Sequence, residues 1–235
     1  MHEAYYYTTI RKLRRNALFP PTLVGAHRKE SEDTVAHEIR TIACLGSGKG
    51  KLGEPMYDEM TEVGRLLTRR KIMVVTGAYG GSGMEAPARG ACEAEGTPVG
   101  YTLGGKRGNE FVRRTVDCND VAQRSGADWP HADFGLRLTG LMSADGFILD
   151  ASGGIGTFLE FITFVLFATK FWQRDEVTKR LAILDLTDTG HAFDSGMLNA
   201  LVTHGLVDKR VGELMAICRT PEEAVCFVTW KPAPR

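Results

Sequence analysis

From residue 41 onward, short apolar runs alternate with segments whose apolar residues recur at helical spacing. Runs such as TIACLGSG, which is apolar and ends in glycines, are typical of buried strands. They predict strands at 41–48, 71–78, 97–103, 145–152, 181–187 and 213–220. The segments between them predict helices at 55–69, 84–96, 134–144, 157–172 and 192–204. This alternation predicts an α/β protein with a doubly wound, Rossmann-like parallel sheet and helices on both of its faces.

Two regions depart from this rhythm. Residues 1–40 show no clear period and are interrupted by Pro20-Pro21, so we expect an N-terminal extension ahead of a Rossmann-like main domain at 41–235. The basic cluster at 11–15 is typical of a solvated surface rather than of a binding site. Residues 104–133 are polar and irregular, which predicts a long loop with one short element.

The start of the last helix carries a full set of helix-initiating residues. Thr220 is placed to cap the helix, Pro221 suits its first position, and Glu223 follows three residues after the cap. We therefore expect a capping box that begins the final helix.

Composition excludes several classes of function. Hydrophobic residues make up 43% of the chain and charged residues 25%, as in ordinary globular proteins. The formal net charge is +0, so nothing favours binding to nucleic acid or to a membrane surface. The five cysteines are scattered, which argues against a disulfide framework or a zinc site. Because neither a run of about 20 apolar residues nor a secretory signal is present, we expect a cytoplasmic protein.

Glycine-rich stretches follow three of the predicted strands. They lie at 46–48, 77–83 and 153–157. In doubly wound sheets, ligands bind at the carboxyl ends of the strands, near the point where the strand order reverses. Three such loops that converge there predict a site for a small anionic ligand.

Two common nucleotide motifs fit poorly. The stretch GSGKGK at 46–51 lacks the spacing of a phosphate-binding P-loop. The stretch GSGMEA at 81–86 matches a dinucleotide fingerprint weakly, but no acidic residue follows at 101–107 to hold an adenine ribose. Because Lys106 and Arg107 could hold a 2′-phosphate there, an NADP-dependent oxidoreductase stays open as a minor alternative.

The stretch DASGGIGTFLE at 150–160 is the most informative. Gly153, Gly154 and Gly156 let backbone N–H groups approach a ligand, and Thr157 stands where a helix N-terminus favours an anion. Glu160 follows about 4.5 Å further along the helix, at 1.5 Å per residue. A carboxylate there suits the oxocarbenium-like transition state of glycosidic bond cleavage. Alternatively, Glu160 is an N3 capping acid of its own helix, and the residues alone leave both interpretations open.

The pattern Gly-Gly-x-Gly-Thr-x-x-Glu at 153–160 resembles the signature of the Lonely Guy family of nucleoside 5′-monophosphate phosphoribohydrolases. The resemblance covers roughly residues 40–230 and includes CLGSG at 44–48 and the Gly-rich turn and helix at 80–96. Arg137 stands at the family's spacing from Glu160. Ser152 replaces the family's usual proline and Leu138 its usual lysine, and the second change leaves the substrate base open.

The resemblance implies hydrolysis of a nucleotide to a free base and ribose 5-phosphate, with no metal and no organic cofactor. It implies that Glu160 and Arg137 are catalytic. The implied phosphate-binding residues are Ser47, Gly153, Gly154, Gly156 and Thr157. Further substrate contacts are expected from Gly46, Gly80, Gly81, Gly83 and Met84. Since some relatives of this fold sense nucleotides without turnover, a non-catalytic sensing module is the alternative from another class.

The predicted helix at 157–172 is apolar nearly all round. Its apolar residues are Phe158, Phe161, Ile162, Phe164, Val165, Leu166, Phe167, Phe171 and Trp172. About half of them can pack on the sheet, and the rest need another cover. We therefore expect at least a homodimer through this helix, an assembly to which the family resemblance also points.

Overall fold

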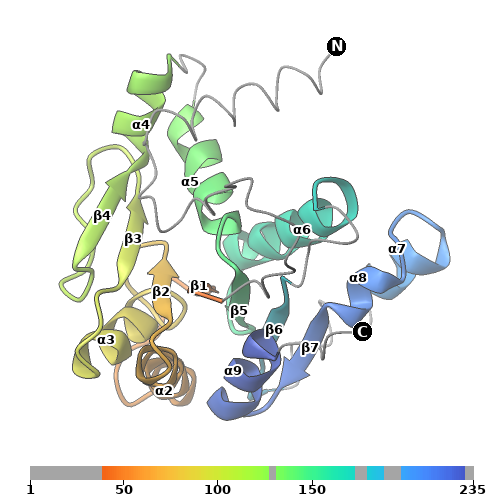
Figure 1. Ribbon diagram of the computed structural model, residues 1–235, viewed down its shortest axis with the longest axis horizontal. Coiled ribbons are helices and arrows are strands. Elements are labelled where there is room, and N and C mark those ends of the chain that lie inside the picture. Colours follow the sequence, from red (N-terminus) through yellow and green to blue (C-terminus); the bar gives the residue numbers. More distant parts are fainter. Residues whose placement is uncertain (1–38, 127–130, 173–178, 188–196, 231–235) are drawn as a thin grey trace, which may run out of the picture.

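The computed structural model describes residues 39–126, 131–172, 179–187 and 197–230. Within these ranges the strands form one parallel sheet in the order β4-β3-β2-β1-β5-β6-β7 (Figure 1). The strands are β1 (Thr41–Leu45), β2 (Met73–Thr76), β3 (Val99–Thr102), β4 (Arg114–Asp117), β5 (Gly146–Asp150), β6 (Leu181–Leu184) and β7 (Met215–Cys218). The predicted α/β, Rossmann-like fold is confirmed.

The strand order reverses at β1. The chain runs outward from β1 through β2, β3 and β4, then returns to place β5 on the other side of β1. Ala43 is thus paired with Val75 of β2 and with Phe147 of β5. Since all pairs are parallel, every strand ends at the same edge, and the crevice between the ends of β1 and β5 is the expected ligand position.

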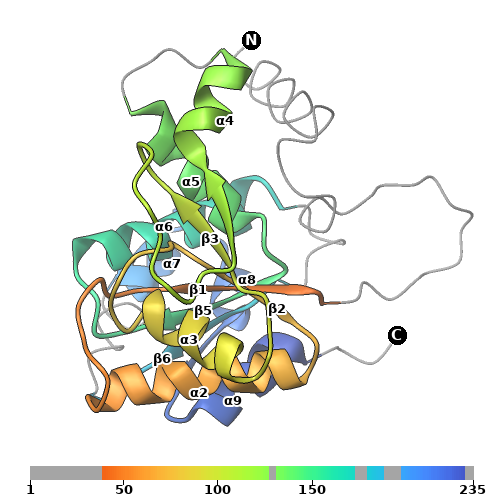
Figure 2. The same cartoon turned by 90° about the vertical axis from the view of Figure 1, so that its left-hand side faces the viewer.

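Helices cover both faces of this sheet, and Figure 2 shows the strands between two groups of them. One group is α2 (Pro55–Arg69), α3 (Glu85–Glu93) and α9 (Pro221–Thr229). The other is α4 (Cys118–Ser125), α5 (Ala132–Met142), α6 (Ile155–Lys170) and α8 (Arg210–Glu213), with α7 (Asn199–Thr203) beside it.

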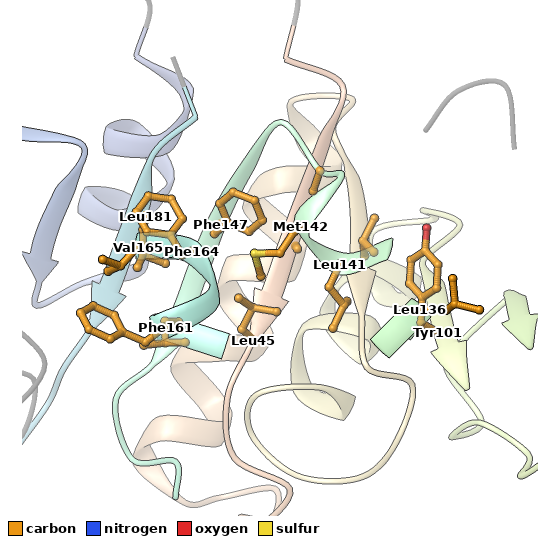
Figure 3. Packing of buried hydrophobic residues seen from close by; sticks show 14 of the residues in the cluster. Leu45, Tyr101, Leu136, Leu141, Met142, Phe147, Phe161, Phe164, Val165 and Leu181 are labelled. Atoms are coloured by element: carbon orange, nitrogen blue, oxygen red, sulfur yellow. The ribbon is translucent and has the colours of Figure 1, made fainter. Parts of the chain in front are cut away.

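Alternation along the central strands divides the interior into two cores. Ile42 and Cys44 of β1 point toward α2 and α9, whereas Ala43 and Leu45 point toward α5 and α6. Figure 3 shows the second core as a continuous row of side chains from Leu181 to Tyr101. Full burial of a large apolar side chain contributes about 1.5–3 kcal/mol, so these rows hold α5 and α6 firmly over the sheet.

Asp145 fastens the amino-terminal edge of the sheet. Its carboxylate accepts hydrogen bonds from Arg40 N (2.9 Å), Thr41 N (3.0 Å) and Thr41 Oγ1 (3.0 Å). It therefore joins the start of β5 to the start of β1, far from the strand ends where the glycine loops lie.

The prediction of a long loop at 104–133 was incomplete, because that segment contains β4, α4 and the start of α5. β4 lies at the edge of the sheet and is half-buried to exposed, so it carries no apolar run. α4 begins where Asp117 caps Asn119 N (2.9 Å) and ends at Gly126, which adopts a left-handed φ of 70°. Short polar edge elements of this kind lack the hydrophobic period on which the prediction relied.

The remaining predicted elements are found with shifted ends. α6 begins at Ile155, two residues before the prediction, and α8 was not predicted. The described part of the helix predicted at 192–204 is α7, and residues 192–196 lie outside the described residues, as do 1–38 of the predicted extension. α9 begins with the expected cap, in which Thr220 Oγ1 accepts from Glu223 N (3.2 Å). None of the helices in the described ranges is long and apolar enough to cross a membrane.

Candidate active site

The N-terminus of α6 lies at the carboxyl end of β5, where the strand order reverses. Gly154 is its N-cap residue and supplies no side-chain cap. Among the described residues, no acceptor is found for the N–H groups of Ile155, Gly156 and Thr157. A helix N-terminus with free N–H groups and the positive end of the helix dipole is a favourable place for an anion.

The three glycines of this loop have different roles. A methyl group on Gly153 would collide with the side chain of Thr157, which is buried against it. A methyl group on Gly154 or Gly156 would meet nothing within 4 Å, and both residues are exposed. Gly153 is therefore required by packing, whereas Gly154 and Gly156 leave space in front of the free N–H groups.

Glu160 lies in the second turn of α6 and reaches across to the end of β1. Its Oε2 accepts a hydrogen bond from Gly46 N at 3.2 Å, and the residue is only 8% exposed. Because α6 begins at Ile155, Glu160 is not at the N3 position, and the alternative that it caps its own helix is wrong.

The environment of Glu160 brings its titration near neutral pH. Burial raises the pKa of its carboxyl to about 7, while the positive charge of Arg137 and the Gly46 N–H act in the opposite direction. Such a carboxyl is about half ionised at pH 7, which is the range in which active-site acids and bases work.

Arg137 projects from α5 to the ends of β2 and β3. Its Nε donates to Tyr101 O (3.1 Å) and its Nη2 to Gly77 O (3.0 Å). A methyl group on Gly77 would collide with this guanidinium, so glycine at this position leaves room for the side chain of Arg137. The Tyr79 ring lies 5.8 Å from the guanidinium carbon. Within the described ranges, Nη1 has no acceptor and Arg137 forms no ion pair with Glu160, so donors remain for a ligand.

The loops after β1 and β2 pack on each other through glycines. A side chain on Gly81, whose φ is +93°, would enter the backbone of the loop at Ser47 and Gly48, and one on Gly83 would enter Gly46. This close approach accounts for Gly81 and Gly83 without a ligand. Gly80 meets only ordinary contact with Glu85 Oε2 at 3.6 Å.

Met84 and Ser47 also lie at this edge. Met84 Sδ is 3.5 Å from Arg137 Nη2, which places the thioether beside the guanidinium. Ser47 N donates to Asp150 Oδ2 (3.3 Å) and its Oγ accepts from Lys49 N (3.0 Å). Ser47 therefore has only its hydroxyl hydrogen left to offer a phosphate.

Two residues beside the site were not assigned to it from the sequence. Asp150 is fully buried where the glycine loops meet. Tyr79 has no motif around it, yet its hydroxyl accepts from Leu103 N (2.7 Å) and holds its ring beside Arg137. A polar residue at the end of a buried apolar strand is a signal that points to Asp150, whereas no sequence signal points to Tyr79.

The described part of the chain contains no group of three or more His, Cys, Asp or Glu residues that could hold a metal ion. What the edge offers is a free helix N-terminus, a buried carboxyl and a fixed guanidinium. Such a set can bind an anion and stabilise positive charge that develops a few ångströms away.

Comparison with known proteins gives a family and a fold. The model of the SLOG cluster4 family matches residues 39–168. The X-ray structure of TM1055, a structural genomics target, is 24% identical with a TM-score of 0.54, covering 79% of this chain and 96% of that one. The Moco carrier protein from Chlamydomonas reinhardtii is 20% identical with a TM-score of 0.53, covering 80% of this chain and 93% of that one. The search of curated proteins found no match.

These findings confirm that the chain has the Lonely Guy-type fold to which its glycine pattern pointed. The two solved structures share less than 25% identity with this chain, and their likeness shows the fold.

Proposed function

The chain belongs to the SLOG cluster4 family, and from that premise we propose that it hydrolyses the N-glycosidic bond of a nucleoside 5′-monophosphate. The products are a free base and ribose 5-phosphate. The observation that carries the proposal is that Arg137 from α5 lies near enough for its charge to act on the buried carboxyl of Glu160, which projects from α6 with its open N-terminus.

Each part of the site has a role in this reaction. The 5′-phosphate binds the free N–H groups of Ile155, Gly156 and Thr157, in the space before Gly154. The ribose then lies beside Glu160, whose carboxylate stabilises the positive charge that develops as the bond between C1′ and the base breaks. Water adds to C1′, and its proton passes to the departing base.

Arg137 binds the base, which is the leaving group of the reaction. Its Nη1 offers N–H donors, and the Tyr79 ring lies beside the guanidinium. A guanidinium there binds the base and offsets the electron pair that it carries away. Because the guanidinium is held by two backbone carbonyls, it is in place before the substrate arrives.

The direct test is incubation of the purified protein with a panel of nucleoside monophosphates and their nucleosides, followed by chromatography of the released bases. We expect base release from at least one monophosphate. Release from the corresponding nucleoside should be slower by roughly a hundredfold or more, because the nucleoside lacks the phosphate whose binding energy lowers the barrier. A nucleoside cleaved as fast as its monophosphate contradicts the role given to the α6 N-terminus.

A glycine substitution tests Arg137 without removing it. Gly77→Ala places a methyl group where the guanidinium lies, so Arg137 must move. We expect kcat/KM to fall about 100-fold, as for a displaced transition-state donor. The matched control is Gly135→Ala on the same helix α5, where the added methyl meets nothing within 4 Å. Equal activities of the two variants would exclude Arg137 from the reaction.

Binding without turnover is the competing outcome. The related fold of the Moco carrier protein belongs, by its title, to a protein that carries a cofactor. If calorimetry detects a nucleotide bound at the α6 N-terminus while no base is released by any monophosphate, the chain is a sensing or carrying module instead. An NADP-dependent enzyme has less support, because Gly81 and Gly83 are accounted for by loop packing.

We also propose a homodimer through α6. Most of its apolar residues pack within the chain, including Phe161, Phe164 and Val165. Exposed apolar side chains remain along one stripe, at Ile155 (84%), Leu159 (39%) and Leu166 (47%). Light scattering of wild type is expected to give about twice 25.8 kDa, and Leu166→Lys is expected to give the monomer. A wild-type monomer that is fully active contradicts this assembly.

A further inference from the structure

Asp150 joins three loops at the carboxyl edge of the sheet. It is fully buried at the end of β5. Its Oδ2 accepts from Ser82 Oγ (2.6 Å) and Ser47 N (3.3 Å), and its Oδ1 accepts from Ser152 N (2.8 Å) and Ser152 Oγ (2.6 Å). These donors come from the loops after β2, β1 and β5, so one carboxylate fastens together the loops that form the candidate site.

No cation pairs with Asp150 in the described part of the chain. A buried carboxylate without a cation is costly unless hydrogen-bond donors surround it. Its four donors meet this need only while the three loops keep their present positions. The loops and the carboxylate therefore hold each other in place.

Asp150 is linked to Glu160 through one residue of backbone. Ser47, whose N–H is donated to Asp150, directly follows Gly46, whose N–H is donated to Glu160. A Cβ on Gly46 would lie 2.6 Å from Asp150 Cβ, so the strand end is packed directly against Asp150. With its left-handed φ of +138°, Gly46 keeps a conformation that other residues rarely adopt.

We propose that Asp150 is a positioning residue that holds the Gly46 N–H against the carboxylate of Glu160. Asp150 touches no substrate in this arrangement and acts through the backbone at 46–47. The proposal rests on the proposed function only for the catalytic use of Glu160, because the contact itself exists without substrate.

The contact has a measurable consequence for Glu160. Two groups act on its carboxyl, namely Arg137 from α5 and the Gly46 N–H that follows β1. Asp150 lies beyond them, on the far side of the backbone at 46–47, where it accepts from Ser47 N. Burial raises the pKa of Glu160, and Arg137 and the Gly46 N–H lower it. Loss of the Gly46 contact must therefore raise this pKa, whereas loss of the negative charge of Asp150 alone can only lower it.

The variant Asp150→Asn distinguishes the loss of the Gly46 contact from the loss of the Asp150 charge, because the first raises the pKa of Glu160 and the second lowers it. Whichever way the new amide is turned, its NH2 group replaces one carboxylate oxygen and faces the backbone N–H of either Ser47 or Ser152. Since neither N–H can accept a hydrogen bond, the loops must shift. We expect the titration midpoint of Glu160 to rise above its wild-type value of about 7.

The titration is followed by NMR of protein with ¹³C-labelled glutamate carboxyls, in which the Glu160 signal is the one missing from Glu160→Gln. The matched control is Asp145→Asn, which removes a similar carboxylate clamp from the opposite ends of the same two strands. The control is expected to lower stability and leave the Glu160 midpoint unchanged. If Asp150→Asn does not fold, Ser82→Ala removes one of the donors and is expected to give a smaller rise.

An unchanged or lowered midpoint in the folded variant overturns the proposal. The hydrolase assay is read separately: for a midpoint one pH unit higher, kcat/KM falls about ninefold at pH 6 and less than about twofold at pH 8.5. A raised midpoint in a protein that cleaves no nucleotide supports the role of Asp150 and removes the proposed function.

Discussion

Helices α9 and α6 each follow a strand of the parallel sheet, and their N-termini are built in opposite ways. α9, after β7, is closed: Thr220 Oγ1 accepts from Glu223 N (3.2 Å), Glu223 Oε2 accepts from Arg219 N (2.8 Å), and Pro221 has no N–H to satisfy. α6, after β5, is open: its cap residue is Gly154, and no side chain caps its first turn.

The difference shows where the chain leaves backbone N–H groups free to bind a ligand. The free N–H groups of a first turn are normally bound by side chains or water, and a good cap contributes about 1 kcal/mol. α9 gains this stabilisation from its N-cap, whereas α6 lacks it. The glutamates follow the same division, since Glu223 serves its own helix end, while Glu160 reaches Gly46 at the end of another strand.

The largest expected effect on activity is that of Glu160→Gln, and Glu223→Gln serves as its matched control. Glu160→Gln keeps the shape and removes the charge that faces the ribose, so kcat should fall on the order of 10³-fold. Glu223→Gln keeps an acceptor for Arg219 N and lies on a closed helix end, so kcat should stay within about twofold of wild type. Both rates are measured by base release from the best monophosphate of the panel.

Circular dichroism on the same samples ensures that both variants are folded. If Glu160→Gln retains near-normal turnover, its carboxylate has no catalytic role, and the openness of α6 would then concern binding alone.

The sequence predicted the central part of this fold because the hydrophobic period is strong there. β1, β2 and β5 are buried on both faces, so their apolar runs were plain. β4 escaped prediction because an edge strand needs few apolar residues, and Arg114 at its start is exposed. α8 escaped because a helix of four residues is too short to show a period.

The candidate site was predictable only where spacing carries information. Gly154, Gly156 and Glu160 share one short motif, and the structure places Arg137 near enough for its charge to act on Glu160. The sequence could not tell that Glu160 binds Gly46 rather than its own helix end, because that contact joins residues far apart in the chain. For the same reason it did not reveal that Asp150 gathers three loops.

The buried carboxyl of Glu160 in α6 should also lower the stability of the folded protein at alkaline pH. The pKa of Glu160 is raised by burial from 4.5 to about 7 in the folded protein. Its contribution to stability is therefore full below pH 4.5 and is lost as the pH rises through 7. Glu160→Gln should match wild type near pH 4 and become more stable above pH 7, by at most about 3 kcal/mol.

Urea unfolding at a series of pH values measures this difference. Glu223→Gln, on the exposed cap of α9, serves as the control and should show no such gain at alkaline pH. A Glu160→Gln variant less stable than wild type at pH 8 contradicts a carboxyl held against its own ionisation.

The smallest effects are expected from adding an N-cap to α6 and from removing the N-cap of α9. Gly154→Asp places a carboxylate at the N-cap of α6, where an added Cβ meets nothing within 4 Å. The free energy of unfolding should rise by about 1 kcal/mol, and KM for the monophosphate should rise roughly 10-fold because the new cap occupies the anion site. Thr220→Ala on α9 should lower stability by about 1 kcal/mol and leave KM unchanged. If Gly154→Asp stabilises the protein yet leaves KM unchanged, the phosphate does not bind at α6, and the missing cap has another cause.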